Sequence, residues 1–334
     1  MPVDPTRRTA PPPASAPVRA LLGRAIPLLC FGLSALGCDQ ARVLRHTAAI
    51  DGAFGAAEVG EQEDDLHVTK GDELRRIDLL GRPLDTYPSG DKRLRLVDLD
   101  ERDLAKGPKA YVTDGAGLWR VLQDEVELLI DVDDVDLRAV ALIDGGLVTL
   151  ELDPEDGCAL KWHDSAVVET ARVLLPGAAC AEGALLRADR SNGDAFVVTL
   201  TGVWAATPGF TPFTWPQGGN LAAFDPAVGA VVIGTRRDTE LRAWSVIGEE
   251  LWYQDLGEPL IEIDDMGALG ALGVLSSRGE GGRIILLDTA GGEPLTAEDL
   301  PVAPVGLSAG RSGARLALRL DAELHVFDVD LEAR

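Results

Sequence analysis

The sequence predicts an all-β protein built from seven copies of one four-stranded unit. Pairs of apolar residues, separated by two positions, recur along the chain, and the second members of successive pairs lie 44, 41, 44, 38, 43 and 40 residues apart. The seven pairs are Leu74/Ile77, Leu118/Val121, Ala159/Trp162, Val203/Ala206, Leu241/Trp244, Ile284/Leu287 and Leu324/Phe327. One four-stranded blade of a β-propeller occupies about 40–45 residues, so the period predicts a propeller of seven antiparallel blades.

Two sets of glycines repeat in the same phase, each placed to turn one strand into the next. A tight turn with positive φ favours glycine. The first set stands four residues after the second member of its apolar pair and comprises Gly81, Gly248 and Gly291. The second set precedes that member by 13, 15 and 14 residues and comprises Gly193, Gly229 and Gly313. Because both glycine sets keep a nearly constant spacing to the apolar pairs, they support the repeat.

Between these turns the chain has the composition of short strands. The runs 195–200 and 230–233 are rich in β-branched residues, as strands are. Residues 324–330 have the phase of a third strand, so residues 47–54 are expected to supply the missing edge of the last blade and close the ring. A β-sandwich or barrel with coincidentally regular spacing is the alternative.

Several segments are similar to known propeller repeats. Residues 244–252 resemble the repeat of quinoprotein-like (PQQ-repeat-like) propellers, and residues 189–194, 223–229 and 307–313 resemble the Ser-Pro-Asp-Gly turn of WD40-like propellers. The resemblance covers most of residues 60–330 and implies the propeller fold. No cofactor is predicted. The tryptophans that recur 43, 42 and 40 residues apart have different offsets within the repeats and are interpreted as inter-blade packing: Trp119, Trp162, Trp204 and Trp244.

The N-terminal residues are typical of an export signal. Residues 1–24 carry four arginines and one acid, and residues 25–37 carry no charge. That uncharged run has the length of a signal-peptide apolar region and is too short to cross a bilayer as a helix. Residues 33–38, Leu-Ser-Ala-Leu-Gly-Cys, resemble the lipobox of bacterial lipoproteins, which implies cleavage before Cys38 and acylation of that cysteine.

The predicted organisation is therefore a signal peptide over residues 1–37, a lipidated tether over residues 38–46 and a propeller domain over residues 47–334. The expected location is the bacterial cell envelope, periplasmic or surface-facing. Two alternatives remain for the signal. One is an ordinary secretory signal cut near Ala35 or Gly37, which would leave Cys38 as a free thiol, and the other is a twin-arginine signal at Arg7 and Arg8.

The domain beyond the anchor is strongly acidic. The full chain has a formal net charge of −24, and removing residues 1–37 leaves 27 basic and 54 acidic residues, a net charge of −27. This charge excludes nucleic acid as a partner, because phosphate backbones reward clustered lysine and arginine. It also disfavours contact with an anionic lipid surface.

Two cysteines remain after processing, Cys158 and Cys180. In an exported chain an even remainder favours a disulfide, with two separate buried thiols as the alternative. No Cys-x-x-Cys or mixed Cys/His spacing typical of a metal site is present.

No catalytic or metal-binding constellation is predicted. Gly306-Leu307-Ser308-Ala309-Gly310 matches the nucleophile elbow, with Asp321 and His325 in hydrolase order, but residues 314–320 read as a strand where the elbow needs a helix, so Ser308 is expected in a blade hairpin. His46, His67, His163 and His325 lack metal-ligand spacing. The acidic runs 98–101, 131–136 and 264–265 lack a calcium-loop pattern and are interpreted as solvated loops between blades.

The predicted function is that of a membrane-anchored, non-catalytic propeller that binds a protein partner in the cell envelope. The alternative is a propeller enzyme or a binder of a small ligand or calcium that uses carboxylates near the central channel.

Overall fold

Seven four-stranded antiparallel sheets follow one another along the chain in a computed structural model, which describes residues 43–60, 64–70, 73–87, 95–100, 109–113, 117–121, 126–131, 136–210, 212–310 and 314–331. The predicted signal peptide and Cys38 lie outside these residues. Within the described residues no helix is long and apolar enough to cross a membrane.

The sheets are numbered here in chain order. The first three consist of β2 (Ala56–Val59), β3 (Asp65–Lys70), β4 (Glu73–Asp78) and β5 (Pro83–Tyr87); β6 (Arg95–Asp100), β7 (Lys109–Thr113), β8 (Gly117–Val121) and β9 (Val126–Asp131); and β10 (Asp136–Ile143), β11 (Gly146–Asp153), β12 (Gly157–Asp164) and β13 (Glu169–Leu174). The next three consist of β14 (Leu185–Ala188), β15 (Ala195–Thr199), β16 (Gly202–Ala206) and β17 (Phe213–Trp215); β18 (Leu221–Asp225), β19 (Ala230–Gly234), β20 (Glu240–Ser245) and β21 (Glu250–Asp255); and β22 (Leu260–Asp265), β23 (Ala271–Arg278), β24 (Gly281–Asp288) and β25 (Pro294–Leu300).

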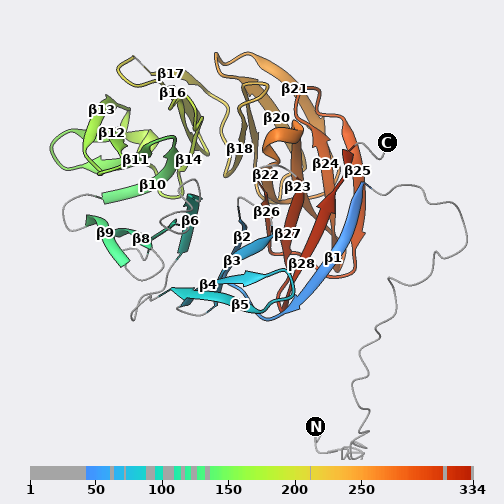
Figure 1. The fold of residues 1–334 in the computed structure, drawn as a ribbon. Helices are drawn as coiled ribbons and strands as arrows, with labels where there is room; N and C mark the ends of the chain where they lie inside the picture. The colour runs from blue at the N-terminus through green and yellow to red at the C-terminus, as the bar shows by residue number, and fades with distance from the viewer. Residues whose placement is uncertain are drawn as a thin grey trace, which may run out of the picture. The chain divides into compact units, whose positions relative to one another are not determined.

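The seventh sheet joins the two ends of the domain. It consists of β26 (Gly306–Ala309), β27 (Arg315–Arg319), β28 (Glu323–Val329) and, as its fourth strand, β1 (Leu44–Asp51). The first strand of each sheet contacts the first strand of the next, from β2 through β6, β10, β14, β18, β22 and β26 back to β2. The sheets therefore form a closed ring of seven blades around a central channel (Figure 1).

The predicted seven-bladed propeller is confirmed, and the apolar pairs have one structural meaning. Every pair lies in the third strand of its sheet, in β4, β8, β12, β16, β20, β24 and β28. This strand is central in its sheet, so its side chains pack against neighbouring blades on both faces. The fourth strand of the last blade spans Leu44–Asp51 rather than residues 47–54. It begins before the predicted tether ends because Leu44 is buried and pairs with Val329.

The turn glycines occupy the predicted turns with one shift. Gly81 and Gly248 have φ of 77° and 81° between the third and fourth strands of their sheets. In the sixth sheet the left-handed residue is Gly292, with φ 73°, rather than Gly291. The reason is a turn one residue longer, in which the Gly292 N–H donates to the Asp288 carbonyl at 2.7 Å. Gly193 and Gly229 also have positive φ, and Gly313 lies outside the described residues.

Apolar side chains from adjacent sheets interlock to form the core. Trp162 of β12 and Trp204 of β16 belong to one buried cluster that spans the third and fourth sheets. The Trp162 indole N–H donates to the Gly193 carbonyl at 2.7 Å, which satisfies its one buried donor. Trp162 and Trp204 therefore pack the third and fourth blades against each other.

A disulfide between Cys158 and Cys180 attaches a short 3-10 helix, η2 (Gly177–Cys180), to β12. The two Cα atoms are 5.6 Å apart, and both cysteines are buried. The Leu175 N–H donates to the Cys158 carbonyl at 2.8 Å. The bond closes the connection that leads from the third sheet to the fourth.

Replacing both cysteines, Cys158→Ser with Cys180→Ser, is expected to lower the free energy of unfolding by about 3 kcal/mol, because a loop of about two dozen residues is no longer closed in the unfolded chain. Denaturant unfolding of the variant and of the oxidised wild type measures this difference. Wild type unfolded under reducing conditions should match the variant. Equal stability of the variant and the oxidised wild type would contradict the expectation.

The third sheet has the same kind of turn as the first and fifth but with valine in place of glycine. The Val167 N–H donates to the Asp164 carbonyl at 2.9 Å, as Gly81 does to Asp78 and Gly248 to Ser245. Val167 has φ 62°. A β-branched residue is strained in that region.

Val167→Gly is therefore expected to raise the free energy of unfolding by about 1 kcal/mol, since relief of strain exceeds the added freedom of the unfolded chain. Gly248→Val is the reciprocal control and should destabilise more strongly, because a Cβ at Gly248 would lie 2.4 Å from the Phe213 ring. Thermal and denaturant melts give both values. A Val167→Gly chain less stable than wild type would refute the strain.

Candidate functional site

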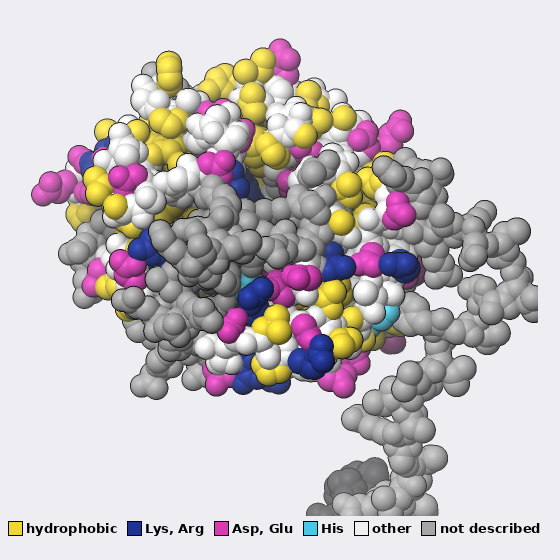
Figure 2. Space-filling view, in the orientation of Figure 1, with side chains coloured by type: hydrophobic (Ala, Val, Ile, Leu, Met, Phe, Trp, Pro, Cys, Tyr) yellow, Lys and Arg dark blue, Asp and Glu magenta, His cyan; other side chains and the backbone are white. Residues whose placement is uncertain are grey.

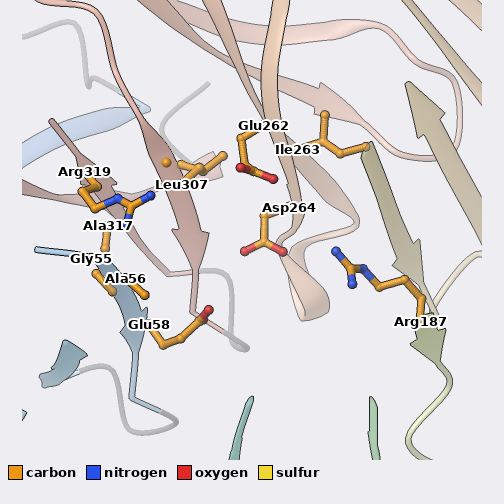
Figure 3. A pocket seen from close by; sticks show the side chains of 12 residues that line it. Gly55, Ala56, Glu58, Arg187, Glu262, Ile263, Asp264, Leu307, Ala317 and Arg319 are labelled. Atoms are coloured by element: carbon orange, nitrogen blue, oxygen red, sulfur yellow. The ribbon is translucent and has the colours of Figure 1, made fainter. Parts of the chain in front are cut away.

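A pocket of about 240 Å³ lies in the central channel, lined by residues of the innermost strands. Its walls come from β2, β14, β22 and β26, with two side chains from β27. Five charged side chains line it, as Figure 3 shows: Glu58, Arg187, Glu262, Asp264 and Arg319. Because these residues belong to four different sheets, only closure of the ring brings them together.

Repeat position explains how three of these side chains reach the channel. Glu58, Arg187 and Glu262 are each the third residue of a first strand, in β2, β14 and β22. Ser308 is the third residue of β26. The equivalent residue of β18 is Ala223, which is buried in the apolar core.

Hydrogen bonds hold two of the carboxylates in place. The Ser308 hydroxyl donates to Glu58 Oε2 at 2.7 Å and accepts from the Val59 N–H at 3.4 Å. The Ala309 N–H donates to Asp264 Oδ2 at 2.8 Å. The first strands of three sheets thus fix these two carboxylates before any ligand arrives.

The two arginines are held by carbonyl oxygens instead of carboxylates. Arg187 donates from Nε to the Ala222 carbonyl at 2.9 Å and from Nη1 to the Leu186 carbonyl at 3.1 Å. Arg319 donates to the carbonyls of Phe54 and Val305 at 3.4 and 3.2 Å. A guanidinium has five N–H donors, and each arginine uses two of them in these bonds to the described residues. Burial lowers the pKa of Arg319 from its ordinary value.

Burial raises the pKa of the carboxyl groups along β22. It raises the pKa of Glu262 above its ordinary value, against the charges of Arg236, Arg187 and Arg319. The Arg236 guanidinium pairs with Glu262 at 3.2 Å. Burial also raises the pKa of Asp264 to about 6, although the Ala309 N–H and the charge of Arg187 oppose the shift.

Asp265 lies close enough to Asp225 of the neighbouring blade to feel its charge. Burial, then the charges of Asp225 and Asp264, raise the pKa of Asp265 to about 8. One oxygen of each, Asp225 Oδ2 and Asp265 Oδ1, is buried and has no hydrogen-bond partner among the described residues. The prediction that residues 264–265 are a solvated loop is therefore wrong. Both residues lie at the end of the innermost strand β22. Asp264 lines the pocket, and Asp265 feels the charge of Asp225 in the neighbouring blade.

The structure describes only part of the other two acidic runs. Asp98 to Asp100 lie in β6, Asp131 ends β9 and Asp136 begins β10. Their remaining residues, 101 and 132–135, lie outside the described residues. Within the described part of the chain, no group of three or more His, Cys, Asp or Glu side chains is arranged to hold a metal ion.

The elbow-like segment is a strand. Ser308 lies within β26 rather than in a hairpin, and β27 follows it where an elbow would need a helix. Asp321 lies in the turn before β28. His325 of β28 lies beside His46 of β1, with Nδ1 3.1 Å from His46 Nε2, and beside Glu323, 2.8 Å from its other ring nitrogen. These contacts are on the outer half of the blade, whereas Ser308 bonds to Glu58 in the channel.

The remaining histidines are structural. Burial lowers the pKa of His67 to about 3, so it is neutral in the core. His163 accepts or donates a bond with the Thr149 hydroxyl at 3.0 Å, next to the buried pair of Lys161 and Glu151.

Sequence inspection missed the charged side chains of the pocket except Asp264. The signal was present as a charged residue inside a short apolar run, in Ala-Ala-Glu-Val, Leu-Leu-Arg-Ala and Leu-Ile-Glu-Ile, at one phase of the repeat. Such an interruption of a first strand indicates a channel position.

The raised pKa values predict how stability depends on pH. Asp264 and Asp265, at about 6 and about 8, keep protons in the folded state that the unfolded chain releases near pH 4, so the free energy of unfolding should fall as pH rises from about 4 to about 8. Asp265→Asn should flatten the fall between about pH 6 and 8, while Glu280→Gln, at an exposed turn, should not. Urea unfolding at a series of pH values measures both, and an unchanged slope in Asp265→Asn would contradict the assignment.

Comparison with known proteins identifies the fold. No protein-family model matches the chain, and no curated protein matches its sequence. Among solved structures it is similar to BBS1N in a crystal structure of BBS1N in complex with ARL6DN, with a TM-score of 0.65 and 11% identity over 86% of this chain and 97% of that one. It is also similar to a chain of the Mitotic Checkpoint Complex, with a TM-score of 0.60 and 11% identity over 91% of this chain and 100% of that one. At this identity, the similarity shows a β-propeller fold.

Proposed function

We propose that this chain is a lipid-anchored propeller of the bacterial cell envelope that binds a protein partner at its central channel. The observation that carries the proposal is the convergence of five charged side chains from four blades on one pocket. Their hydrogen-bond and ion-pair partners hold them on a closed ring, so a binding partner meets a rigid surface and little free energy is lost in ordering that surface.

The chemistry of the pocket suits a polypeptide segment that carries both charges. Glu58, Glu262 and Asp264 attract a cationic side chain, and the donors of Arg187 and Arg319 suit a carboxylate or a carbonyl. The two similar structures are propellers in complexes with protein partners. The net charge of −24 also favours a partner with a basic surface.

The anchor in the proposal rests on the lipobox-like residues that end at Cys38. Acyl chains contribute about 0.8 kcal/mol for each buried methylene, so two or three chains hold a protein on a membrane firmly.

A small charged ligand is the second candidate, with calcium as one possibility. The carboxylates of Glu262 and Asp264, which lie near each other in Figure 3, favour a charged ligand. The pocket also has room for a small molecule. A thermal melt with calcium and with chelator separates the candidates, since a calcium-dependent rise of many degrees would support the ligand-binding function.

The anchor is tested by detergent partitioning of the wild type against Cys38→Ala. The wild type is expected in the detergent phase with the mass of an acylated chain, and the variant in the aqueous phase or with its signal retained. Equal partitioning of the two would contradict a lipid anchor at Cys38.

The partner site is tested with a photo-crosslinking residue at Val305, which is exposed beside the pocket residue Gly306. The matched control position is Leu174, exposed on the outer strand β13. Arg187→Gln with Arg319→Gln should weaken capture at Val305 roughly tenfold if these arginines are binding hot spots, whereas Arg172→Gln, on the outer strand β13, should not. Equal capture at the two positions, or capture unaffected by the double change, would contradict a channel partner.

A further inference from the structure

Large exposed apolar side chains gather at one end of the propeller. In an antiparallel four-stranded blade, the turn after the first strand and the turn after the third strand lie at the same end. We call this end the turn face and define it by the exposed apolar residues on or beside these turns: Leu80, Val168, Phe210, Phe213, Val228, Val246 and Ile247. The opposite end, within the described residues, has Leu174, Leu200, Val302 and Val305.

Contacts between turns confirm that neighbouring blades share this end. The Asp144 N–H, in the first turn of the third sheet, donates to the Arg190 carbonyl, in the first turn of the fourth sheet, at 2.7 Å. The Val246 N–H donates to the Gly229 carbonyl at 3.2 Å, which joins the two turns of the fifth sheet. A Cβ at Gly248 would touch the Phe213 ring of the fourth sheet. Figure 2 shows hydrophobic side chains gathered at the top of the view, over β17, β20 and β21.

The turn geometry holds apolar tips out into solvent. Asp78 Oδ1 accepts from the Leu80 and Arg82 N–H groups at 2.9 and 2.8 Å, which leaves Leu80 73% exposed at the tip. Ile247 occupies the same position of the equivalent turn in the fifth sheet and is 63% exposed. A soluble surface gains nothing from such side chains, so their gathering marks an interaction surface.

The chain enters the propeller at the same end. Leu44 pairs with Val329, so the start of β1 occupies the place that the turn between third and fourth strands has in the other sheets. The Asp330 N–H donates to the Val43 carbonyl at 2.9 Å, and the Val329 N–H donates to the Ala314 carbonyl, in the first turn of this sheet, at 2.8 Å. Val43 and the start of β1 therefore lie at the turn face.

We propose that the turn face lies against the lipid bilayer, with its apolar tips inserted between headgroups, an inference that rests on the proposed lipid anchor at Cys38. Five residues, 39–43, separate Cys38 from Leu44, and a chain of this length spans at most about 20 Å. A small folded domain is about 30 Å across, so no folded partner fits between this face and the anchored membrane.

The charges of the face define the lipid it suits. Arg45 and Arg82 are exposed near the entry of β1 and at a turn, and each is paired with a carboxylate, Asp328 and Asp78 respectively. Their remaining N–H donors can meet lipid phosphates. The acidic domain as a whole is repelled by anionic headgroups. The face therefore suits a zwitterionic surface such as phosphatidylcholine, and anionic lipid should weaken its contact.

The test places a polarity-sensitive fluorophore at Ile247→Cys and, as a matched control, at Leu200→Cys, which is 67% exposed at the opposite end. Two full-length forms are held on phosphatidylcholine vesicles, one by its native acyl chains and one, Cys38→Ala, by an N-terminal histidine tag on a nickel-chelating lipid. In both forms, label 247 should show blue-shifted emission that a quencher-labelled lipid removes, and label 200 should not.

The second arm measures affinity without a tether. Cosedimentation of untagged Cys38→Ala with the same vesicles should weaken roughly tenfold for Ile247→Asp, because one exposed apolar side chain loses its burial, and should not change for Leu200→Asp. If the intact mass shows that the chain is not acylated, the proposed anchor is wrong. The histidine-tagged form still tests whether the turn face contacts lipid. A silent label 247 on vesicles, or its crosslinking to a protein instead of lipid in cells, would overturn the inference.

Discussion

The pairing of β1 with β28 is the constraint on which the rest of this structure depends. It joins residues 44–51 to residues 323–329, so the last blade is completed by the first residues of the domain. The strand also packs in two directions. Leu44 belongs to the apolar cluster shared with the sixth sheet, and Ile50 to the cluster shared with the first. Without this strand, β28 would present an unpaired edge, and two inter-blade interfaces would lose apolar surface.

Closure of the ring is what gives the channel its chemistry. Neighbouring first strands come close enough for Ser308 of one sheet to bond Glu58 of the next, and for Ala309 to bond Asp264 of the sheet before it. The same proximity removes water from Asp264 and Asp265, and this burial raises the pKa of both carboxyl groups. Ionisation of these buried carboxyl groups lowers the free energy of unfolding. This loss accompanies a rigid site in which charged side chains are held in place before a ligand binds.

The sequence was sufficient for the architecture because its signal is local and repeated. An apolar pair in a central strand, such as Leu241 with Trp244, must pack on both faces in every blade, so its spacing reports the repeat. The residues of the pocket could not be predicted from the sequence in this way. Arg187 and Glu262 are 75 positions apart in the chain and meet only because seven blades close. Asp264 was interpreted as solvated because an acidic residue in sequence carries no sign of its direction, and the starting point of β1 depended on Leu44 finding a partner at Val329.

The proposed membrane surface lies at one end of the ring, whereas the channel pocket extends along the first strands to the other end. The pocket runs from Gly55 and Gly306, at or just before the start of first strands, to Glu58 and Asp264, near the ends of first strands. The turn face lies where first strands end and where β1 begins. If Cys38 is acylated as proposed, an anchor that precedes β1 would direct the turn face to the membrane and the entrance beside Gly55 and Gly306 away from it. Because the blades are interlocked, the proposed short connection to Cys38 would then orient the channel for the proposed partner, which would approach from the aqueous side.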